Sequence, residues 1–293
     1  AGCGARPNVT ECLRALPARA LEVFDIAPEY MFHALGPCKE CDNFLPWLPV
    51  VEPATLPLSP LNAIRRGLHN AVPTLISTTS NETLGFFPTP FMVVGRPHIT
   101  YDVLLRILMK DRAPAVKQHY AETRDTAHMR DGIELMGIVS TDALMGCYAR
   151  YLARKLSEHS PSVYLSTFSH APKSCDMPLN EVCLRGLPGG AACHACDLPY
   201  QLIRSARSTA RTGVGYFQAG ERELAETYTS ATLRFVYGDE HEFAAYRGDV
   251  DASNIWTIKG RRTELGYHRS HCDFLESVGF GDDPWDDSVL QGA

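Results

Sequence analysis

The stretch from residue 72 to residue 79, Val-Pro-Thr-Leu-Ile-Ser-Thr-Thr, predicts a buried strand, because it is a short run of apolar and β-branched residues. The polar helical stretch Pro60 to Asn70 precedes it, and a second run of the same kind, Val163 to Phe168, follows much later. Segments with the apolar spacing of amphipathic helices lie at about residues 100–111, 114–124, 141–158 and 221–236. Strands that are separated by helices predict an α/β sheet.

The composition indicates a globular chain. Of its 293 residues, 45% are hydrophobic and 21% are charged, so the chain can bury a sizeable core. A formal net charge of -6 and the lack of a basic cluster argue against a nucleic-acid partner. No apolar run approaches the roughly 20 residues that span a bilayer. No repeat or linker divides the sequence, so residues 1–293 are expected to form part of one domain, with an acidic tail from about residue 279 to residue 293.

The cysteines favour a secretory origin, and the start of the chain indicates a longer or processed protein. Ala1-Gly2-Cys3-Gly4 lacks the regions of a signal peptide, so the chain is expected to begin within a longer protein or after processing. Ten cysteines, an even number, favour disulfides and a secreted or lumenal location. The sequons at Asn8 and Asn81 suit a glycoprotein, although such tripeptides also arise by chance.

Several short segments follow one another in an order that matches a known family. They are Gly2-Cys3 with Glu11-Cys12-Leu13-Arg14, Phe44 to Val51, Val72 to Glu82, Ser140-Thr141-Asp142 leading to Val163 to His170, Cys193-His194-Ala195-Cys196-Asp197-Leu198-Pro199-Tyr200, and Cys272-Asp273-Phe274. Together they resemble the C-terminal half of type-B carboxylesterases and cholinesterases. The resemblance implies part of an α/β-hydrolase fold, a mostly parallel sheet flanked by helices, which an N-terminal half completes.

The resemblance also implies a serine-hydrolase site. His194 stands where the family has its base, Glu82 where it has the acid that orients the base, and Asp197 matches a further carboxylate nearby. The base moves the proton of the nucleophile, and the acid fixes the tautomer of the imidazole. No Gly-x-Ser-x-Gly turn, which would expose a nucleophilic serine, exists in this chain. Either a separate N-terminal chain supplies the serine and the oxyanion hole, or the activity is absent; no cofactor is expected.

Two disulfides have counterparts in the family. The resemblance pairs Cys3 with Cys12 and Cys147 with Cys272. Six further cysteines have no such counterpart and allow many pairings; they are Cys38, Cys41, Cys175, Cys183, Cys193 and Cys196. Cys175 with Cys183 is the most economical local pair. The two Cys-x-x-Cys pairs also have the ligand types of a tetrahedral zinc site, but an oxidising compartment argues against zinc, and no metal is expected.

The sequence departs from the family pattern beside both site residues. Thr83 stands where the family usually has glycine after the acid, and Ala195 replaces the glycine after the base. An alanine there is harmless only if its φ is negative. His268 and His271 have the spacing of a metal motif, but Cys272 beside them is assigned to a disulfide, so both histidines are interpreted as surface residues.

Two hypotheses about function follow. In the first, the chain is half of an active serine esterase that acts on carboxylic esters. In the second, it is a non-catalytic, cholinesterase-like module for adhesion or assembly. Retention of Glu82 and His194 favours the esterase, whereas the missing serine and the altered flanks favour the module.

Overall fold

The computed structural model describes residues 2–4, 6–20, 51–52, 54–86, 97–129, 132–172, 183, 190–202, 217 and 220–279. The chain divides into two compact units, one of Ala1–Pro57 with Pro284–Ala293 and one of Leu58–Asp283. The expectations of a single domain portion and of an acidic tail stay predictions, and the tail lies outside the described residues. Over the described ranges, no helix has the length and apolar character needed to cross a membrane.

The described residues of the first unit include the short helix α1 (Val9–Arg14). Asn8 precedes this helix, and its Oδ1 accepts a hydrogen bond from the backbone amide of Glu11 at 3.0 Å, which satisfies one of the open donors at the helix start. Cys3 and Cys12 form the disulfide that the family resemblance implies.

The second unit is built on a four-stranded sheet in the order β1-β2-β3-β4. The strands are β1 (Thr74–Thr79), β2 (Val163–Phe168), β3 (Ala252–Thr257) and β4 (Gly260–Leu265). β1 pairs with β2 and β2 with β3 in parallel, whereas β3 and β4 form an antiparallel hairpin. The two strands predicted from the sequence are confirmed, and the hairpin is an addition to them.

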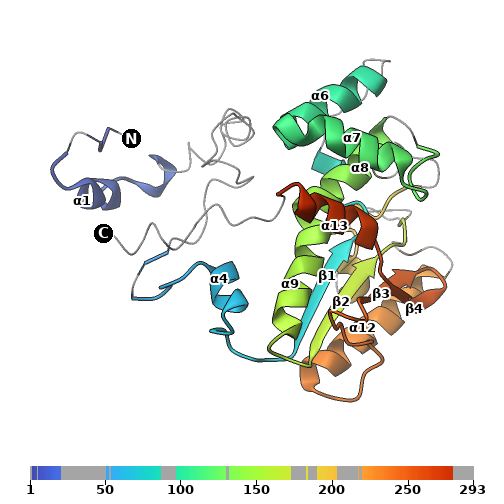
Figure 1. Cartoon of the computed structure of the whole chain (residues 1–293). Coiled ribbons are helices and arrows are strands. Elements are labelled where there is room, and N and C mark those ends of the chain that lie inside the picture. The colour runs from blue at the N-terminus through green and yellow to red at the C-terminus, as the bar shows by residue number, and fades with distance from the viewer. Residues whose placement is uncertain are drawn as a thin grey trace. The chain divides into compact units, whose positions relative to one another are not determined.

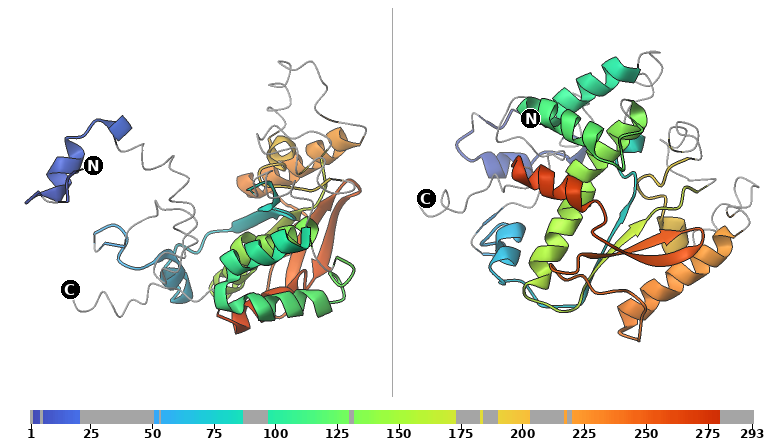
Figure 2. Two further views of the ribbon diagram at one scale, coloured as in Figure 1. Left: turned by 90° about the horizontal axis from the view of Figure 1, so that it is seen from above. Right: turned by 45° about the vertical axis from the view of Figure 1, so that its right-hand side comes forward.

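Helices cover both faces of this sheet (Figure 1 and Figure 2). On one face, α9 (Cys147–Ser157) packs its Ala153 and Leu156 against alternate β2 residues, including Val163 and Leu165. On the other face, α12 (Glu221–Tyr237) packs against residues of the opposite parity, including Phe168. Because successive side chains of a strand point to opposite faces, β2 is buried on both sides, as expected for a parallel sheet between helix layers.

Some of the remaining helices pack together and form a second apolar core beside the sheet. The remaining described helices are α4 (Pro60–Arg65), α6 (Pro97–Met109), α7 (Ala113–Glu122), α8 (Ile133–Thr141), α11 (Leu198–Gln201) and α13 (Arg269–Ser277), with short 3₁₀ turns at Leu84–Phe86 and Lys110–Arg112 and a π-helical segment at Asp142–Gly146. Four of them share one apolar cluster: α6, α7, α8 and α13. The helix predicted at 141–158 is therefore the π-helical segment followed by α9.

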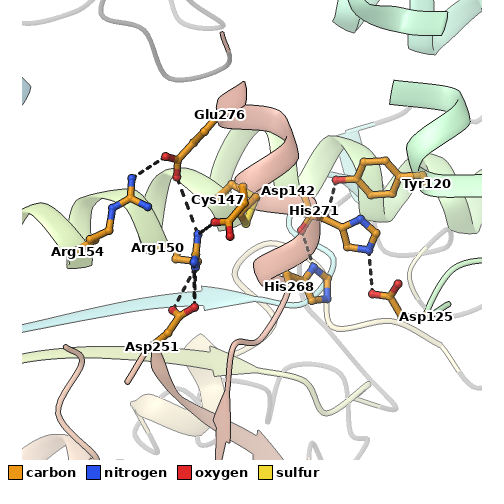
Figure 3. The surroundings of a disulfide bond; sticks show 12 residues. Tyr120, Asp125, Asp142, Cys147, Arg150, Arg154, Asp251, His268, His271 and Glu276 are labelled. Atoms are coloured by element: carbon orange, nitrogen blue, oxygen red, sulfur yellow. Dashed lines mark hydrogen bonds and ion pairs between the residues drawn. A yellow bond between two sulfur atoms is a disulfide. The ribbon is translucent and has the colours of Figure 1, made fainter. Parts of the chain in front are cut away.

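The disulfide Cys147–Cys272 joins α9 to α13, as the resemblance implies (Figure 3). Beside it, the Arg150 guanidinium donates to the buried carboxylate of Asp251 at 2.9 Å, with only 7% and 1% of the two side chains exposed. Arg150 also donates to Asp273 at 2.7 Å. Because a buried charge is tolerated only with a partner, this network fixes how the helix layer sits on the β3–β4 hairpin.

The interpretation of His268 and His271 as surface residues is wrong. His271 is fully buried, and its Nε2 lies 2.8 Å from Oδ2 of Asp125, while Nδ1 of His268 lies 2.7 Å from Oδ1 of Asp142 (Figure 3). Both carboxylates lie more than a hundred residues upstream, so the sequence around the histidines gives no sign of them. Asp125 and Asp142 both belong to the segment between β1 and β2, so the two histidines hold the start of α13 against that segment.

His268 is expected to make stability depend on pH. Burial lowers the pKa of its imidazole, but the Asp142 carboxylate outweighs burial and raises this pKa above the ordinary value of 6.5. The folded state thus favours the charged form, so this contribution is fully present below pH 6.5 and is lost as the pH rises through the folded pKa. Urea unfolding should show that His268→Gln lowers the free energy of unfolding more at about pH 5.5 than at about pH 9. An equal loss at both values would contradict the assignment.

Candidate active site

Glu82 lies just beyond the carboxyl end of β1, and two hydrogen bonds fix its carboxylate. Oε1 accepts from the backbone amide of Thr79 at 2.6 Å, so the side chain folds back over the end of its own strand. Oε2 is 2.6 Å from Nδ1 of His194. The Glu82 side chain is 9% exposed, which shields this contact from solvent on the acid side.

Thr83, which replaces the usual glycine, fits its position. Its backbone has no positive φ, so a side chain costs nothing there. The Thr83 hydroxyl lies 2.5 Å from the hydroxyl of Ser140, and the Thr83 amide donates to Oγ1 of Thr141 at 3.3 Å. Since both partners are in the last turn of α8, the substitution ties the acid loop to that helix.

Backbone pairing brings the histidine turn to the acid. The Asn81 amide donates to the carbonyl of Ala192 at 3.0 Å, and Asn81 and Cys193 form an isolated parallel bridge. The segment 192–193 therefore continues the sheet beside the end of β1 and delivers His194 next to Glu82.

The geometry fixes the tautomer of His194. A carboxylate can only accept, so Nδ1 carries the proton and donates it to Glu82. The ring then has its lone pair on Nε2, the atom that acts as proton acceptor in a serine hydrolase. The His194 side chain is 45% exposed, in contrast to the buried acid. This arrangement can orient a base and stabilise its charged form.

Asp197 is buried near the two site residues. It is 8% exposed, so it is not a solvated loop acid. Burial raises the pKa of its carboxyl above the ordinary value, and the Glu82 carboxylate raises it further, while His194 acts in the opposite direction. The Asp197 carboxylate accepts from Nε2 of Gln201 at 2.6 Å. Gln201 in turn donates to the Tyr228 hydroxyl at 3.1 Å.

The chain of hydrogen bonds that runs from Asp197 through Gln201 and Tyr228 to Ser77 was not predicted. Tyr228 comes from α12, and its hydroxyl lies 3.0 Å from Oγ of Ser77 in the middle of β1. Burial is the main cause that raises the pKa of Tyr228 to about 12, so it stays a neutral phenol. Sequence reasoning had only the apolar spacing of this helix, which gives no sign that its tyrosine hydroxyl meets a strand.

The serines near the site are engaged elsewhere. The hydroxyl of Ser77 contacts Tyr228, and that of Ser166 is fully buried and donates to the carbonyl of Asn254 at 3.3 Å. Ser205 and Ser208 lie outside the described residues. Neither Ser77 nor Ser166 is placed as an exposed nucleophile.

The cysteines on either side of His194 are both in disulfides. Cys193 bonds to Cys183, so the prediction that Cys183 pairs with Cys175 is wrong. Cys196 is also disulfide-bonded. Because a zinc ligand must be a free thiolate, the alternative of a site with Cys193 and Cys196 fails. Cys38, Cys41 and Cys175 lie outside the described residues.

The turn that carries His194 is strained at Ala195. The Cys196 amide donates to the carbonyl of Cys193 at 3.0 Å, and Ala195 has a φ of +62° while that of His194 is not positive. That pattern is a type II turn, which favours glycine at its third position. The condition under which alanine would be harmless is therefore not met.

Ala195→Gly is expected to stabilise the protein. A left-handed conformation costs a non-glycine residue about 1–2 kcal/mol, and the greater freedom of glycine in the unfolded chain offsets part of the gain. The expected rise in the free energy of unfolding is therefore about 1 kcal/mol. Urea denaturation measures it, with Ala191→Gly, which lies outside the turn, as the control that should destabilise. A loss of stability in the Ala195→Gly variant would show that Ala195 is not strained.

Comparison with known proteins identifies relatives of this chain. A sequence profile of the carboxylesterase family matches residues 1–264. The cAMP-regulated D2 protein of Dictyostelium discoideum is 29% identical over 146 residues, which are 47% of this chain and 26% of that protein.

Two solved structures share the fold. A thermophilic PNB esterase has a TM-score of 0.62 at 20% identity, and a PNB esterase has 0.61 at 21%. Each match covers 92% of this chain, but only 50% and 51% of those two chains. The chain thus has part of an α/β-hydrolase fold, and it spans about half the length of these structures and 26% of the curated relative. With the profile matching from residue 1 to residue 264, the chain belongs to the carboxylesterase family.

Proposed function

We propose that this chain supplies the acid and the base of a serine esterase whose nucleophile comes from a separate N-terminal half. The contact of 2.6 Å between Nδ1 of His194 and Oε2 of Glu82 carries this proposal. It is the contact that a triad requires, and its two members come from loops 112 residues apart in the sequence. Membership of the carboxylesterase family supports the choice of carboxylic esters as the substrate class.

The reaction would follow the acyl-transfer route. Nε2 of His194 takes the proton of the serine hydroxyl as its oxygen attacks the ester carbonyl, and Glu82 stabilises the resulting imidazolium. The imidazolium returns the proton to the departing alcohol, which leaves an acyl-serine. Water, deprotonated by the same nitrogen, then releases the acid. The N-terminal half would supply the oxyanion hole.

A fluorophosphonate probe tests the proposal. It reacts with serines that a base activates, so the complete protein should be labelled on a serine of the N-terminal half, and hydrolysis of a nitrophenyl ester should stop as labelling proceeds. Labelling on this chain would show that the serine comes from elsewhere in the fold. A structure of the complete protein with glycine or another non-nucleophile facing His194 would decide against an esterase.

The second candidate is a non-catalytic module for adhesion or assembly. The lack of a Gly-x-Ser-x-Gly turn in this chain and the alanine in place of glycine after His194 favour it, because both depart from the pattern of an active esterase. The same labelling experiment separates the two functions, since a module without a nucleophile takes up no probe.

The partner half is proposed to cover the open side of β1. Within the described ranges, β1 pairs along one edge only, with β2. An uncovered edge strand is prone to association. Residues 1–293 expressed alone are therefore expected to aggregate or to unfold without cooperativity, as measured by size exclusion and urea titration. A soluble monomer with a cooperative transition would contradict a required partner.

Secretion and glycosylation are proposed as well. Three disulfides among the described residues suit an oxidising compartment. Asn8 is exposed at the start of α1, whereas Asn81 adjoins the acid. Peptide mass mapping after glycosidase treatment of protein from a secretory host should find a deamidated residue at Asn8. An unmodified Asn8 would argue against the secretory route.

A further inference from the structure

The histidine turn is held by covalent bonds that the catalytic chemistry itself does not need. His194 lies between Cys193 and Cys196, and both sulfurs are in disulfides. The family resemblance offers no counterpart for either cysteine, and Ala195, between them, is the one residue of the turn with a left-handed backbone. The same short segment therefore combines a site residue, a disfavoured backbone and two cross-linked cysteines.

The disulfide between Cys183 and Cys193 is buried in an apolar cluster next to the site residues. Cys183, Cys193 and Cys196 are at most 2% exposed and pack in one cluster with Leu84. Leu84 follows the acid by two residues, so the cluster joins the histidine turn to the acid loop. The Ala191 amide also donates to the Cys183 carbonyl at 2.8 Å, which binds Cys183 to the segment before the turn.

The backbone of the turn works against the position of the imidazole. The His194 side chain is about half exposed. Before it in the chain, the Cys193 carbonyl accepts from the Cys196 amide and the Ala192 carbonyl accepts from the Asn81 amide. The left-handed φ of Ala195 favours relaxation of the turn to other conformations. Such a change rotates the backbone directly after His194 and moves Nδ1 away from Glu82.

We propose that the Cys183–Cys193 disulfide is a positioning element for His194, which holds the left-handed turn at Ala195 so that the imidazole stays on Glu82. A glycine at position 195 would adopt this left-handed conformation without strain, so with alanine there the disulfide is needed to hold it. The inference concerns the position of the His194 imidazole. It rests on the proposed function only for the measurements of kcat.

The test combines removal of the disulfide with relief of the strain. In the complete protein, Cys183→Ala with Cys193→Ala should lower kcat for a nitrophenyl ester roughly 10- to 100-fold with little change in KM, because a base displaced by about 1 Å loses that much rate. Adding Ala195→Gly to this double variant should restore most of kcat.

The matched control is the disulfide Cys3–Cys12. Its cysteines are 9 residues apart, against 10 for Cys183 and Cys193, so the two bonds close loops of nearly equal length. Replacing Cys3 and Cys12 with alanine should leave kcat within about twofold, because this bond only closes a short loop at α1. Equal losses of kcat from both double variants would overturn the inference.

A second readout is independent of the serine. In protein labelled at histidine, the Nδ1 proton of His194 should give a downfield resonance from its bond to Glu82. The double variant at Cys183 and Cys193 should lose this resonance, and the further change Ala195→Gly should restore it. If the wild type hydrolyses no ester yet shows this loss and recovery, the positioning role stands and the proposed function fails.

Failure of the double variant to fold also gives an answer. Recovery of folding and of the resonance in the triple variant, which adds Ala195→Gly, supports positioning. A triple variant that still does not fold, or that folds without the resonance, overturns it, because the disulfide then serves stability alone.

Discussion

His194→Ala is expected to lower the rate of ester hydrolysis and of fluorophosphonate labelling by about 10⁴- to 10⁶-fold. Without the imidazole no group takes the proton from the serine, so the hydroxyl stays weakly nucleophilic. The side chain is about half exposed, so its loss removes little packing, but it leaves Oε2 of the buried Glu82 without this partner, and the free energy of unfolding should fall by about 1–3 kcal/mol. A kinetic assay of the complete protein, combined with urea unfolding, measures both effects.

Two further variants make this test specific. Glu82→Gln keeps the size of the side chain but removes its negative charge. Because the amide of glutamine can also donate, the His194 ring can adopt the wrong tautomer, and the rate of ester hydrolysis should fall roughly 10⁴-fold. His128→Ala, at an exposed histidine remote in sequence from the site, should leave the rate unchanged. Activity that survives His194→Ala would mean that another residue is the base.

Loss of the Cys147–Cys272 disulfide is expected to have the largest effect on stability. The bond joins residues 125 apart, so in the chain-entropy account it limits the unfolded chain by about 4–5 kcal/mol, less any strain in the native state. Replacing both cysteines with alanine should lower the free energy of unfolding by this amount. Urea titration of the complete protein under non-reducing conditions measures it.

The short disulfide Cys3–Cys12 is the control for this prediction. Its cysteines are 9 residues apart, so the same account gives about 2.5–3 kcal/mol for its removal. The long bond should therefore cost about 2 kcal/mol more than the short one. Equal costs would show that loop closure does not explain the stabilisation. A cost below about 1 kcal/mol for Cys147 and Cys272 would mean that strain in the native state offsets most of the chain-entropy gain.

The parts of the fold with a strong local pattern could be predicted. β1 and β2 were found from short β-branched runs, and the helices near α6, α7, α9 and α12 from apolar spacing. β3 was missed, because Ser253 and Asn254 make it read as polar. Asn254 is nonetheless fully buried, and its amide donates to the carbonyls of Leu165 and Ala244 at 3.0 Å. Only the neighbouring backbone makes that residue acceptable in a core.

The site divides in the same way. The sequence alone identified the residues that are proposed to carry the chemistry, because His194 and Glu82 follow from the order of the family segments, and the lack of a Gly-x-Ser-x-Gly turn is read directly from the chain. Only the tertiary structure decided how they meet, because the contact depends on the pairing of Asn81 with the segment at Cys193. It also decided that Cys183 bonds to Cys193 and that Ala195 is left-handed. Both depend on distances between segments and on backbone angles, and residue spacing along a chain contains neither.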